Sequence, residues 1–463
     1  MIALTAGAIA TLTGGRLFPE GADPNVLVEG PVVTDSRLAR PGGLYIARVG
    51  EQADGHDFVA AAAELGALLS LTTRPVGDYP CVVVGDTQDA FVALARATVD
   101  AVPDLTIIGI TGSSGKTSTK DLLGQVLASH GETIAPEGSF NSEVGVPLTV
   151  CRVERSTRYL VVEMGARGVG HVEYLTRIAP PRIGVVLNVG VAHVGEFGSR
   201  EAIAIAKREL VEALPPAGLA VLNADDPVVA AMAAYTHARV VLVGESETAA
   251  IRAVDVAVDP QGRAIFTAQT PVGDRTVHLA LIGRHHVGNA LAALAVALEC
   301  GMDLESACSA LESATPISRW RMELTRRADG VLVVNDAYNA NPDSMRVALD
   351  SLAHLGGVGR TWAVLGTMLE LGEDSEEMHA EVGRYAAEQG ISDLIAVADG
   401  AEQIARGAEA HGGIRVHRAV DAEAAEVFLA EELSPGDVVL FKSSRNAGLR
   451  WLGDRVAGRQ VSS

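Results

Sequence analysis

Residues 105–118 read LTIIGITGSSGKTS, and this stretch decides how the middle of the chain folds. The β-branched run before Gly112 predicts a buried strand, and apolar residues at helical spacing after Ser118 predict a helix. A strand, a glycine-rich loop and a helix form the usual setting of a nucleotide-phosphate loop, where backbone N–H groups surround phosphate oxygens. The residues predicted to bind ATP or GTP are Gly112, Ser113, Ser114, Gly115, Lys116, Thr117 and Ser118.

Two side chains of this loop carry the expected chemistry. Lys116 is predicted to reach the β- and γ-phosphates, and the Thr117 hydroxyl to ligate Mg²⁺. The spacing departs from the usual G-x-x-x-x-G-K, because Ile110 stands where that pattern has glycine and Gly109 precedes it. A chance glycine-rich turn is the alternative interpretation.

Lysine is scarce in this chain, which directs attention to the lysines that remain. Of 37 basic residues four are lysine, at positions 116, 120, 207 and 442. A bias toward arginine codons explains the scarcity, and under such a bias a remaining lysine tends to stand where a guanidinium cannot replace an amine. We therefore treat Lys207 and Lys442 as functional candidates, and expect Lys120 on the surface of a helix.

Composition limits the classes of function. A chain of 463 residues is too long for one core, so two to four domains are expected. The net charge of −21 argues against nucleic acid or an anionic membrane as the main partner. The four cysteines form no C-x-x-C pair and are expected as buried thiols in a reducing cytoplasm. Because no apolar run approaches the roughly 18 residues of a membrane helix, no membrane insertion is expected.

The order of predicted elements divides the chain into three α/β units. Residues 1–103 form a small N-terminal unit, 104–314 a central unit and 315–463 a third unit. In the central unit strands at 105–111, 159–163, 183–189 and 219–222 alternate with helices, which predicts a mostly parallel sheet of the phosphate-loop ATPase type. Short alternating runs at 251–282 predict antiparallel strands at its edge. The third unit is predicted to be a Rossmann-like open sheet, with strands near 331–335, 361–366, 393–397 and 437–441.

Candidate residues of the central unit follow strand ends or lie on helices. Glu163 ends a predicted strand, where it either holds Mg²⁺ or is an ordinary strand-end carboxylate. His193 follows another strand and is either a ligand or a structural histidine. Lys207 shares an apolar helix face with Ile203 and Leu210, so its stem snorkels, its amine is neutral, or it is modified. A neutral amine can take up CO₂ to form a carbamate, which resembles a carboxylate ligand.

Further candidates lie at the end of the central unit and in the third unit. Asn289 either caps a helix or contacts adenine through its amide. Arg321 is a candidate phosphate clamp and Asp336 a candidate ribose ligand, although a structural ion pair explains each equally well. Such strand ends are where open α/β sheets collect ligands.

The order of these residues resembles the Mur ligase family over nearly the whole chain. The loop 109–117 has that family's own glycine spacing, which accounts for Ile110. Positions matching the family's invariant residues, in order, are Glu163, His193, Asn289, Arg321 and Asp336. Lys207 matches a lysine that is carbamylated in several members, and KSSR at 442–445 is similar to the closing K-G-S-R, with Ser443 in place of glycine. His286 stands where most members have asparagine.

Three segments resemble the branch of the family that adds D-alanyl-D-alanine. The N-terminal TDSR at 34–37 is similar to a UDP-binding domain, while DAYNANP at 336–342 and GTMLELG at 366–372 resemble that branch in the third unit. A D-N-P-R motif, found in relatives that add diaminopimelate, is missing. The resemblance implies ATP-driven joining of D-alanyl-D-alanine to UDP-N-acetylmuramoyl-tripeptide through an acyl phosphate, for peptidoglycan synthesis.

The resemblance also assigns roles to residues. It implies one Mg²⁺ on Thr117 and Glu163, and a second on His193 and the Lys207 carbamate. The residues expected to act in catalysis are Lys116, Glu163, His193, Lys207 and Arg321. ATP is expected to contact the loop residues together with Asn289, Arg321 and Asp336. The residues expected to bind the other substrates are Ser36, Arg37, Asn141, Asn339, Asn341, Lys442, Ser443 and Arg445.

Other functions stay open on the sequence. A Mur-type ligase that adds a single amino acid, or a relative of folylpolyglutamate synthetase, would share most of these motifs. A regulatory ATPase or scaffold is an alternative of another class. A cytoplasmic monomer with small-molecule substrates is expected, and the third residue of the peptide, lysine or a diaminopimelate, is left undetermined.

Overall fold

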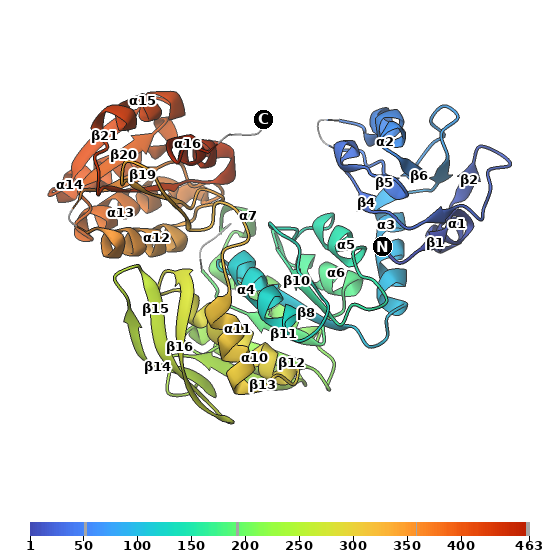
Figure 1. Ribbon diagram of the computed structural model, residues 1–463, viewed down its shortest axis with the longest axis horizontal. Helices are drawn as coiled ribbons and strands as arrows, with labels where there is room; N and C mark the ends of the chain where they lie inside the picture. The colour runs from blue at the N-terminus through green and yellow to red at the C-terminus, as the bar shows by residue number, and fades with distance from the viewer. Residues whose placement is uncertain (51–52, 191–193, 358, 460–463) are drawn as a thin grey trace.

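The computed structural model of the protein describes residues 1–50, 53–190, 194–357 and 359–459. Three α/β units follow one another, with the N-terminal unit and the third unit on either side of the central one (Figure 1). This arrangement confirms the predicted three-unit α/β fold. In the described residues no helix combines the length and apolar character needed to cross a membrane.

The N-terminal unit is a small sheet with helices. Its strands lie in the order β2 (Arg16–Phe18), β7 (Cys81–Val83), β6 (Ala67–Thr72), β5 (Gly43–Ile46) and β4 (Val32–Val33). A separate pair is formed by β1 (Leu4–Thr5) and β3 (Leu27–Val28). Its helices are α1 (Ala6–Thr13), α2 (Val59–Glu64) and α3 (Thr87–Asp100). Apolar residues of α3 share one core cluster with the central sheet, which joins the two units.

The central unit is built on a nine-stranded sheet. Its order is β16 (Gly273–Ile282), β15 (Arg263–Thr270), β14 (Ile251–Val258), β13 (Arg239–Gly244), β12 (Leu219–Asn223), β11 (Ile183–Val186), β8 (Thr106–Thr111), β10 (Tyr159–Glu163) and β9 (Thr133–Ile134). The strands from β9 to β14 pair in parallel, and β14, β15 and β16 pair antiparallel at one edge, as predicted. The strand β13 was not predicted, because its short apolar run has no distinctive period.

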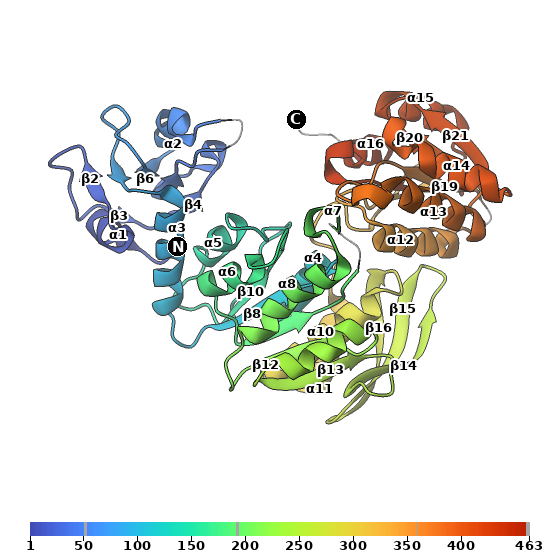
Figure 2. The ribbon, with the colours of Figure 1, turned by 180° about the vertical axis from the view of Figure 1, so that it is seen from behind.

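Helices cover both faces of this sheet, which buries its alternating side chains on two sides. On one face lie α4 (Lys116–Ala128), α10 (His286–Glu299) and α11 (Leu304–Ser313), as Figure 1 shows. On the other lie α5 (Gly145–Val150), α6 (His171–Ile178) and α8 (Arg200–Glu212), in front of the sheet in Figure 2. Ile108 and Ile110 of β8 face the first set, whereas Ile107 packs with the second. The phosphate loop therefore follows directly after a buried strand.

The third unit is an open six-stranded sheet. Its order is β17 (Glu323–Arg326), β18 (Leu332–Asn335), β22 (Val438–Lys442), β19 (Thr361–Leu365), β20 (Asp393–Val397) and β21 (Arg415–Ala419). The helices α12 (Pro342–Leu355), α13 (Ser375–Glu388) and α14 (Glu402–His411) pack in one core cluster, and α15 (Ala422–Glu432) and α16 (Leu449–Val456) in another. Strands β17 and β21 were not predicted.

The connection between the central and third units runs along the phosphate-loop helix. Gln125 and Thr315 exchange hydrogen bonds, with Nε2 to the Thr315 carbonyl at 2.9 Å and the Thr315 N–H to Oε1 at 3.0 Å. The Ser318 N–H donates to Asp121 Oδ2 at 3.1 Å, one turn nearer the loop. Because these acceptors are four residues apart on α4, one stripe of the helix holds the connecting segment.

Lys120 corrects one prediction about this helix. It was expected on the surface, but it is 1 % exposed. Its ammonium donates to the carbonyl oxygens of Pro136 and, at 2.9 Å, Gly138, and pairs with Asp121 Oδ1 at 2.6 Å. The helix face that carries Lys120 is covered by the segment after β9, which could not be located from sequence alone.

Candidate functional site

The phosphate loop has the form that anion binding requires. Gly115 has φ +81° and directly precedes α4, and a Cβ there would lie 3.1 Å from Asn289 Oδ1. Glycine therefore satisfies both a left-handed backbone and a close contact. The loop is tied to the end of β11 by two hydrogen bonds, in which the Ser113 and Ser114 N–H groups donate to the Asn188 carbonyl and side chain at 3.1 and 2.9 Å.

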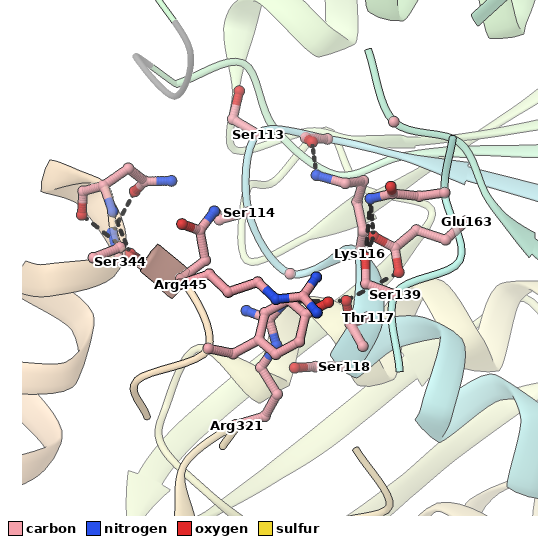
Figure 3. Close-up of a pocket in the computed structure, with 18 of the residues that line it drawn as sticks. Ser113, Ser114, Lys116, Thr117, Ser118, Ser139, Glu163, Arg321, Ser344 and Arg445 are labelled. Atoms are coloured by element: carbon pink, nitrogen blue, oxygen red, sulfur yellow. Dashed lines mark hydrogen bonds between the residues drawn. The ribbon is translucent and has the colours of Figure 1, made fainter. Parts of the chain in front are cut away.

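Lys116 and Thr117 are the first two residues of α4, directly after the loop (Figure 3). Lys116 Nζ donates to the Gly112 carbonyl at 2.7 Å, so its ammonium lies across the loop where phosphate oxygens would sit. Burial lowers the pKa of Lys116, while the Glu163 carboxylate acts in the opposite direction. An incoming phosphate anion would therefore stabilise the charged form of this buried amine.

Glu163 ends β10 beside the loop, because β10 pairs with β8 and places Glu163 opposite Ile110. Its carboxylate accepts from Thr117 Oγ1 at 2.9 Å, and from Ser139 Oγ and Asn141 Nδ2 at 2.8 Å each. The sequence predicted Glu163 and Asn141 but not Ser139. Buried carboxylate and hydroxyl oxygens at this point are ligand types that Mg²⁺ prefers.

Lys207 lies on the buried face of α8, as its spacing predicted. It is 5 % exposed, and Ile203 and Leu210 on the same face are fully buried. Within the described residues its amine has no hydrogen bond and no ion pair, yet it lines the same cavity as the phosphate loop. Burial, with a smaller contribution from the charge of Lys116, lowers the pKa of Lys207 to about 7. The lowered pKa favours the neutral amine, and the burial of the whole side chain excludes a snorkelling surface lysine.

His193 falls outside the described residues, so its predicted role stays a prediction. Its neighbour in α7 (Val194–Phe197), Gly195, contacts the third unit: the Gly195 N–H donates to the Glu370 carbonyl at 3.0 Å. A Cβ at Gly195 would lie 2.6 Å from the Gly372 nitrogen. Two backbones therefore meet closely at this boundary between the units.

Asn289 and His286 form a small polar pair at the start of α10. The helix begins at His286, so Asn289 lies one turn inside it and the capping interpretation is wrong. Asn289 Nδ2 donates to His286 Nδ1 at 3.3 Å, and both side chains line the cavity. Burial holds the pKa of His286 well below its usual value, so this imidazole is neutral and accepts the amide hydrogen. The histidine at this position thus orients Asn289.

In the third unit, Asp336 and Lys442 form a buried ion pair. Lys442 Nζ lies 2.6 Å from Asp336 Oδ2 and 3.1 Å from the Asn339 carbonyl. The second carboxylate oxygen accepts from the Met322 N–H at 3.0 Å. The structural interpretation of Asp336 therefore holds, although its side chain also lines the cavity.

One cavity of about 1370 Å³ collects most of the predicted residues from the central and third units. Those that line it are Gly112, Ser113, Ser114, Gly115, Lys116, Thr117, Ser118, Asn141, Glu163, Lys207, Asn289, Arg321, Asp336, Asn339, Asn341, Lys442 and Arg445. Arg321 Nη2 donates to Thr117 Oγ1 at 3.2 Å, which links the third unit to the first turn of α4 (Figure 3). The oxygen of Asn341 accepts from the Ser344 N–H at 2.8 Å and caps α12.

Three predicted residues lie away from this cavity. Ser36 and Arg37 belong to the N-terminal unit, where Arg37 is exposed and pairs with Asp35 at 2.7 Å. Ser443 is fully buried against Gly366 and does not line the cavity, so its substrate contact stays a prediction that this structure does not support. Its neighbour Ser444 lines the cavity instead.

Besides Ser139 and Ser444, sequence reasoning missed Tyr338 and His379, which also act on the cavity walls. Tyr338 lines the cavity inside the motif that was noticed for Asp336. His379 is buried on α13, where its Nε2 accepts from the Met368 N–H at 2.9 Å and its Nδ1 donates to the Ser375 carbonyl at 2.6 Å. It thereby holds the turn 366–372, and Leu369 and Glu370 of that turn line the cavity. The G-T-M-L-E-L-G spacing located the turn but not the histidine behind it.

Comparison with known proteins agrees with this geometry. Residues 110–297 match the Mur ligase middle domain, and residues 320–445 match the Mur ligase, glutamate ligase domain. The UDP-N-acetylmuramoyl-tripeptide–D-alanyl-D-alanine ligase of Mycobacterium bovis is 47% identical, and the match covers 98% of each chain. The chain belongs to the Mur ligase family.

More distant Mur ligases share the whole architecture. The ligase of the same name from Bacillus subtilis is 34% identical over 97% of each chain. A crystal structure of MurF from Acinetobacter baumannii has a TM-score of 0.88 at 31% identity and covers 99% of both chains. MurF from Thermotoga maritima in complex with ADP has a TM-score of 0.79 at 29% identity, covering 92% of this chain and 97% of that one. The predicted family is thus confirmed across all three units.

Proposed function

We propose that this Mur ligase joins D-alanyl-D-alanine to UDP-N-acetylmuramoyl-tripeptide with hydrolysis of ATP to ADP and phosphate. The observation that carries the proposal is a single cavity in which a phosphate loop, a strand-end carboxylate and cations from two units converge. The similarity to relatives named UDP-N-acetylmuramoyl-tripeptide–D-alanyl-D-alanine ligase supports D-alanyl-D-alanine, and not a single amino acid, as the group that is added.

The chain's own groups would bring two anions together. The peptide carboxylate attacks the γ-phosphorus of ATP, ADP leaves, and an acyl phosphate forms. The loop N–H groups, Lys116 and Arg321 would stabilise the negative charge that develops on the transferring phosphate. The amine of D-alanyl-D-alanine then attacks the acyl carbon, and phosphate leaves with the bonding electrons.

The donor set fits magnesium. Thr117 and Glu163 would hold one ion, because they offer a hydroxyl and a carboxylate at the phosphate loop. The buried amine of Lys207, which has no partner among the described residues, would become a carboxylate-like ligand on carbamylation, and would hold a second ion together with His193. Magnesium in these places would neutralise charge on the phosphates.

The proposed contacts to the uridine diphosphate and to the dipeptide are assigned from where their residues lie in the fold. Ser36 and Arg37 in the N-terminal unit would hold the uridine diphosphate, far from the chemistry (Figure 1). Asn339 and Arg445 in the third unit line the cavity where the dipeptide would enter. Action as a cytoplasmic monomer, on small molecules and without nucleic acid, stays a prediction.

A product measurement tests the proposed function. Full-length protein is incubated with ATP, Mg²⁺, UDP-N-acetylmuramoyl-tripeptide and D-alanyl-D-alanine, and the nucleotide product is weighed by mass spectrometry. A mass increase of one dipeptide less one water is expected, with one phosphate released for each product. Product from single amino acids but not from the dipeptide would assign another Mur-type activity. ATP hydrolysis that no substrate changes would favour a regulatory ATPase, and Lys116→Ala controls for contaminating enzymes.

A further inference from the structure

Arg321 and Arg445 are two of the four arginines that line the cavity and form no ion pair within the described residues; the other two are Arg167 and Arg450. Arginines elsewhere in the same unit do form such pairs, for example Arg415 with Asp393 at 2.5 Å. Two uncompensated guanidinium groups in one cavity repel each other and attract a shared anion. Something must fix their positions before that anion arrives.

Tyr338 contacts both guanidinium groups. Its ring centroid lies 4.3 Å from Arg321 Cζ and 5.6 Å from Arg445 Cζ, both within the reach of a cation–π interaction. The Tyr338 N–H donates to the Trp320 carbonyl at 3.3 Å, and the Trp320 ring is stacked on Tyr338 at 6.5 Å. Trp320, which directly precedes Arg321, therefore holds the backbone and the ring of Tyr338 in place.

The two arginines aim at the phosphate loop. Arg321 and Arg445 extend toward Thr117 in Figure 3, and Arg321 reaches its hydroxyl at 3.2 Å. Arg321 Nε is buried without a hydrogen-bond partner among the described residues, so its N–H remains available to donate to a ligand. Thr117 marks the end of the loop where the terminal phosphate of a nucleotide would lie. A phosphate there would meet both arginines.

We propose that Tyr338 is a positioning residue that holds Arg321 and Arg445 as a pair on the transferring phosphate. The proposal rests on the proposed function for the identity of that phosphate. Tyr338 acts through the electron-rich face of its ring and not through its hydroxyl, which makes no hydrogen bond within the described residues. The ring offsets the repulsion between the arginines and keeps them extended while the cavity is open to solvent.

Fluorination of the ring tests this role with little change of shape. Position 338 is replaced in the full-length protein by phenylalanine and by 4-fluoro-, 3,5-difluoro- and 3,4,5-trifluorophenylalanine, which progressively weaken the negative ring face. We expect Tyr338→Phe to stay within about threefold of the native kcat/KM for ATP, and the trifluoro variant to fall about tenfold below Phe. The KM for D-alanyl-D-alanine should change by less than about twofold, since the ring acts on the phosphate end.

Tyr385 provides the matched control in the same unit. Its ring centroid lies 5.7 Å from Arg346 Cζ, but neither residue lines the cavity. The same series at position 385 should leave every kinetic constant unchanged. Circular dichroism melts on both series report whether a variant is folded.

The outcomes separate the alternatives. A stepwise loss at 338 alone supports the proposal. Equal activity across the fluorinated series overturns it, and so does a Tyr338→Phe variant as impaired as Tyr338→Leu, which would assign the role to the hydroxyl. Calorimetric titration with a non-hydrolysable ATP analogue is run on the same proteins, with a rising Kd expected along the series. Wild-type protein that binds this analogue but makes no dipeptide-extended product would refute the proposed substrates while the titration still decides the role of Tyr338.

Discussion

Replacement of Lys442 by methionine should destabilise the third unit by leaving a buried carboxylate unpaired. Lys442 is 2 % exposed and Asp336 is 9 % exposed, so loss of the ammonium leaves a largely buried carboxylate without its charged partner. Asp336 would keep its bond from the Met322 N–H and lose the contact at 2.6 Å. Removing one partner of a buried pair costs about 3–5 kcal/mol. In a unit of about 150 residues this corresponds to a fall in Tm of roughly 6–20 °C.

The double variant Asp336→Asn/Lys442→Met should regain most of that stability, because no charge is then left buried. Hydrogen exchange measured by mass spectrometry on the peptides of β18 and β22 localises the effect to this unit. An exposed pair serves as control: Arg384→Ala breaks the 2.6 Å contact with Glu377 and should cost under about 1 kcal/mol.

Two results would refute this reasoning. One is a Lys442→Met protein as stable as the native chain, and the other is a double variant no more stable than the single one. The same set also decides the second role of Asp336. If its carboxylate holds the ribose of ATP, the double variant regains stability but keeps a raised KM for ATP, whereas a purely structural pair restores both.

Three further outcomes are expected. Lys207→Met should lower the rate of ligation about 10²-fold or more. The pKa of Lys207 is about 7 in the folded protein and ordinarily 10.5, so between these values the unfolded chain binds one more proton than the folded protein. The free energy of unfolding of the native protein should therefore rise with pH over that window, whereas that of the variant should stay constant in buffer that contains a metal chelator. Added bicarbonate should raise the Tm of the native protein but not that of the Lys207→Met variant. Identical melting curves for the two proteins, at every pH and with bicarbonate, would contradict both the pH dependence and the carbamylation. His379→Leu should raise the KM for the dipeptide, since the buried Met368 N–H loses its acceptor, whereas His379→Gln supplies a carbonyl oxygen and should recover most activity in steady-state assays. Arg37→Ala should raise the KM for the nucleotide sugar and leave that for the dipeptide nearly unchanged; a collapse of kcat at saturation in a folded variant would remove Arg37 from the substrate site.

Local patterns predicted the parts of this protein that a single segment specifies. The phosphate loop needs a strand, glycines and a helix in succession, all of which lie within residues 105–118. The apolar stripe around Lys207 and the strand-end position of Glu163 are likewise readable from period and order. Glu163 lines the cavity because parallel strands bring their carboxyl ends to one edge of the sheet, whereas Lys207 reaches the same cavity from the buried face of α8.

Features that depend on a distant segment were not predictable in this way. Lys120 is buried by carbonyl groups from the segment after β9, and Ser443 turns inward because Gly366 of a neighbouring strand end leaves room for it. Tyr338 and His379 act on the cavity through partners in other elements. Their residue types carry no such information until the fold supplies the neighbours.

The contact between Gly195 and Gly372 has a consequence for tolerance to mutation. Added methyl groups would collide here with backbone atoms and not with side chains that could rotate aside: the gaps are 2.6 Å at position 195 and 3.1 Å at position 372. No compensating substitution in a side chain can therefore recreate the space. A saturation library selected for cell growth should return glycine at both positions, while the exposed residues around them vary freely. At position 372 the positive φ of +74° adds a second requirement for glycine, so the two positions should tolerate less change than their surroundings.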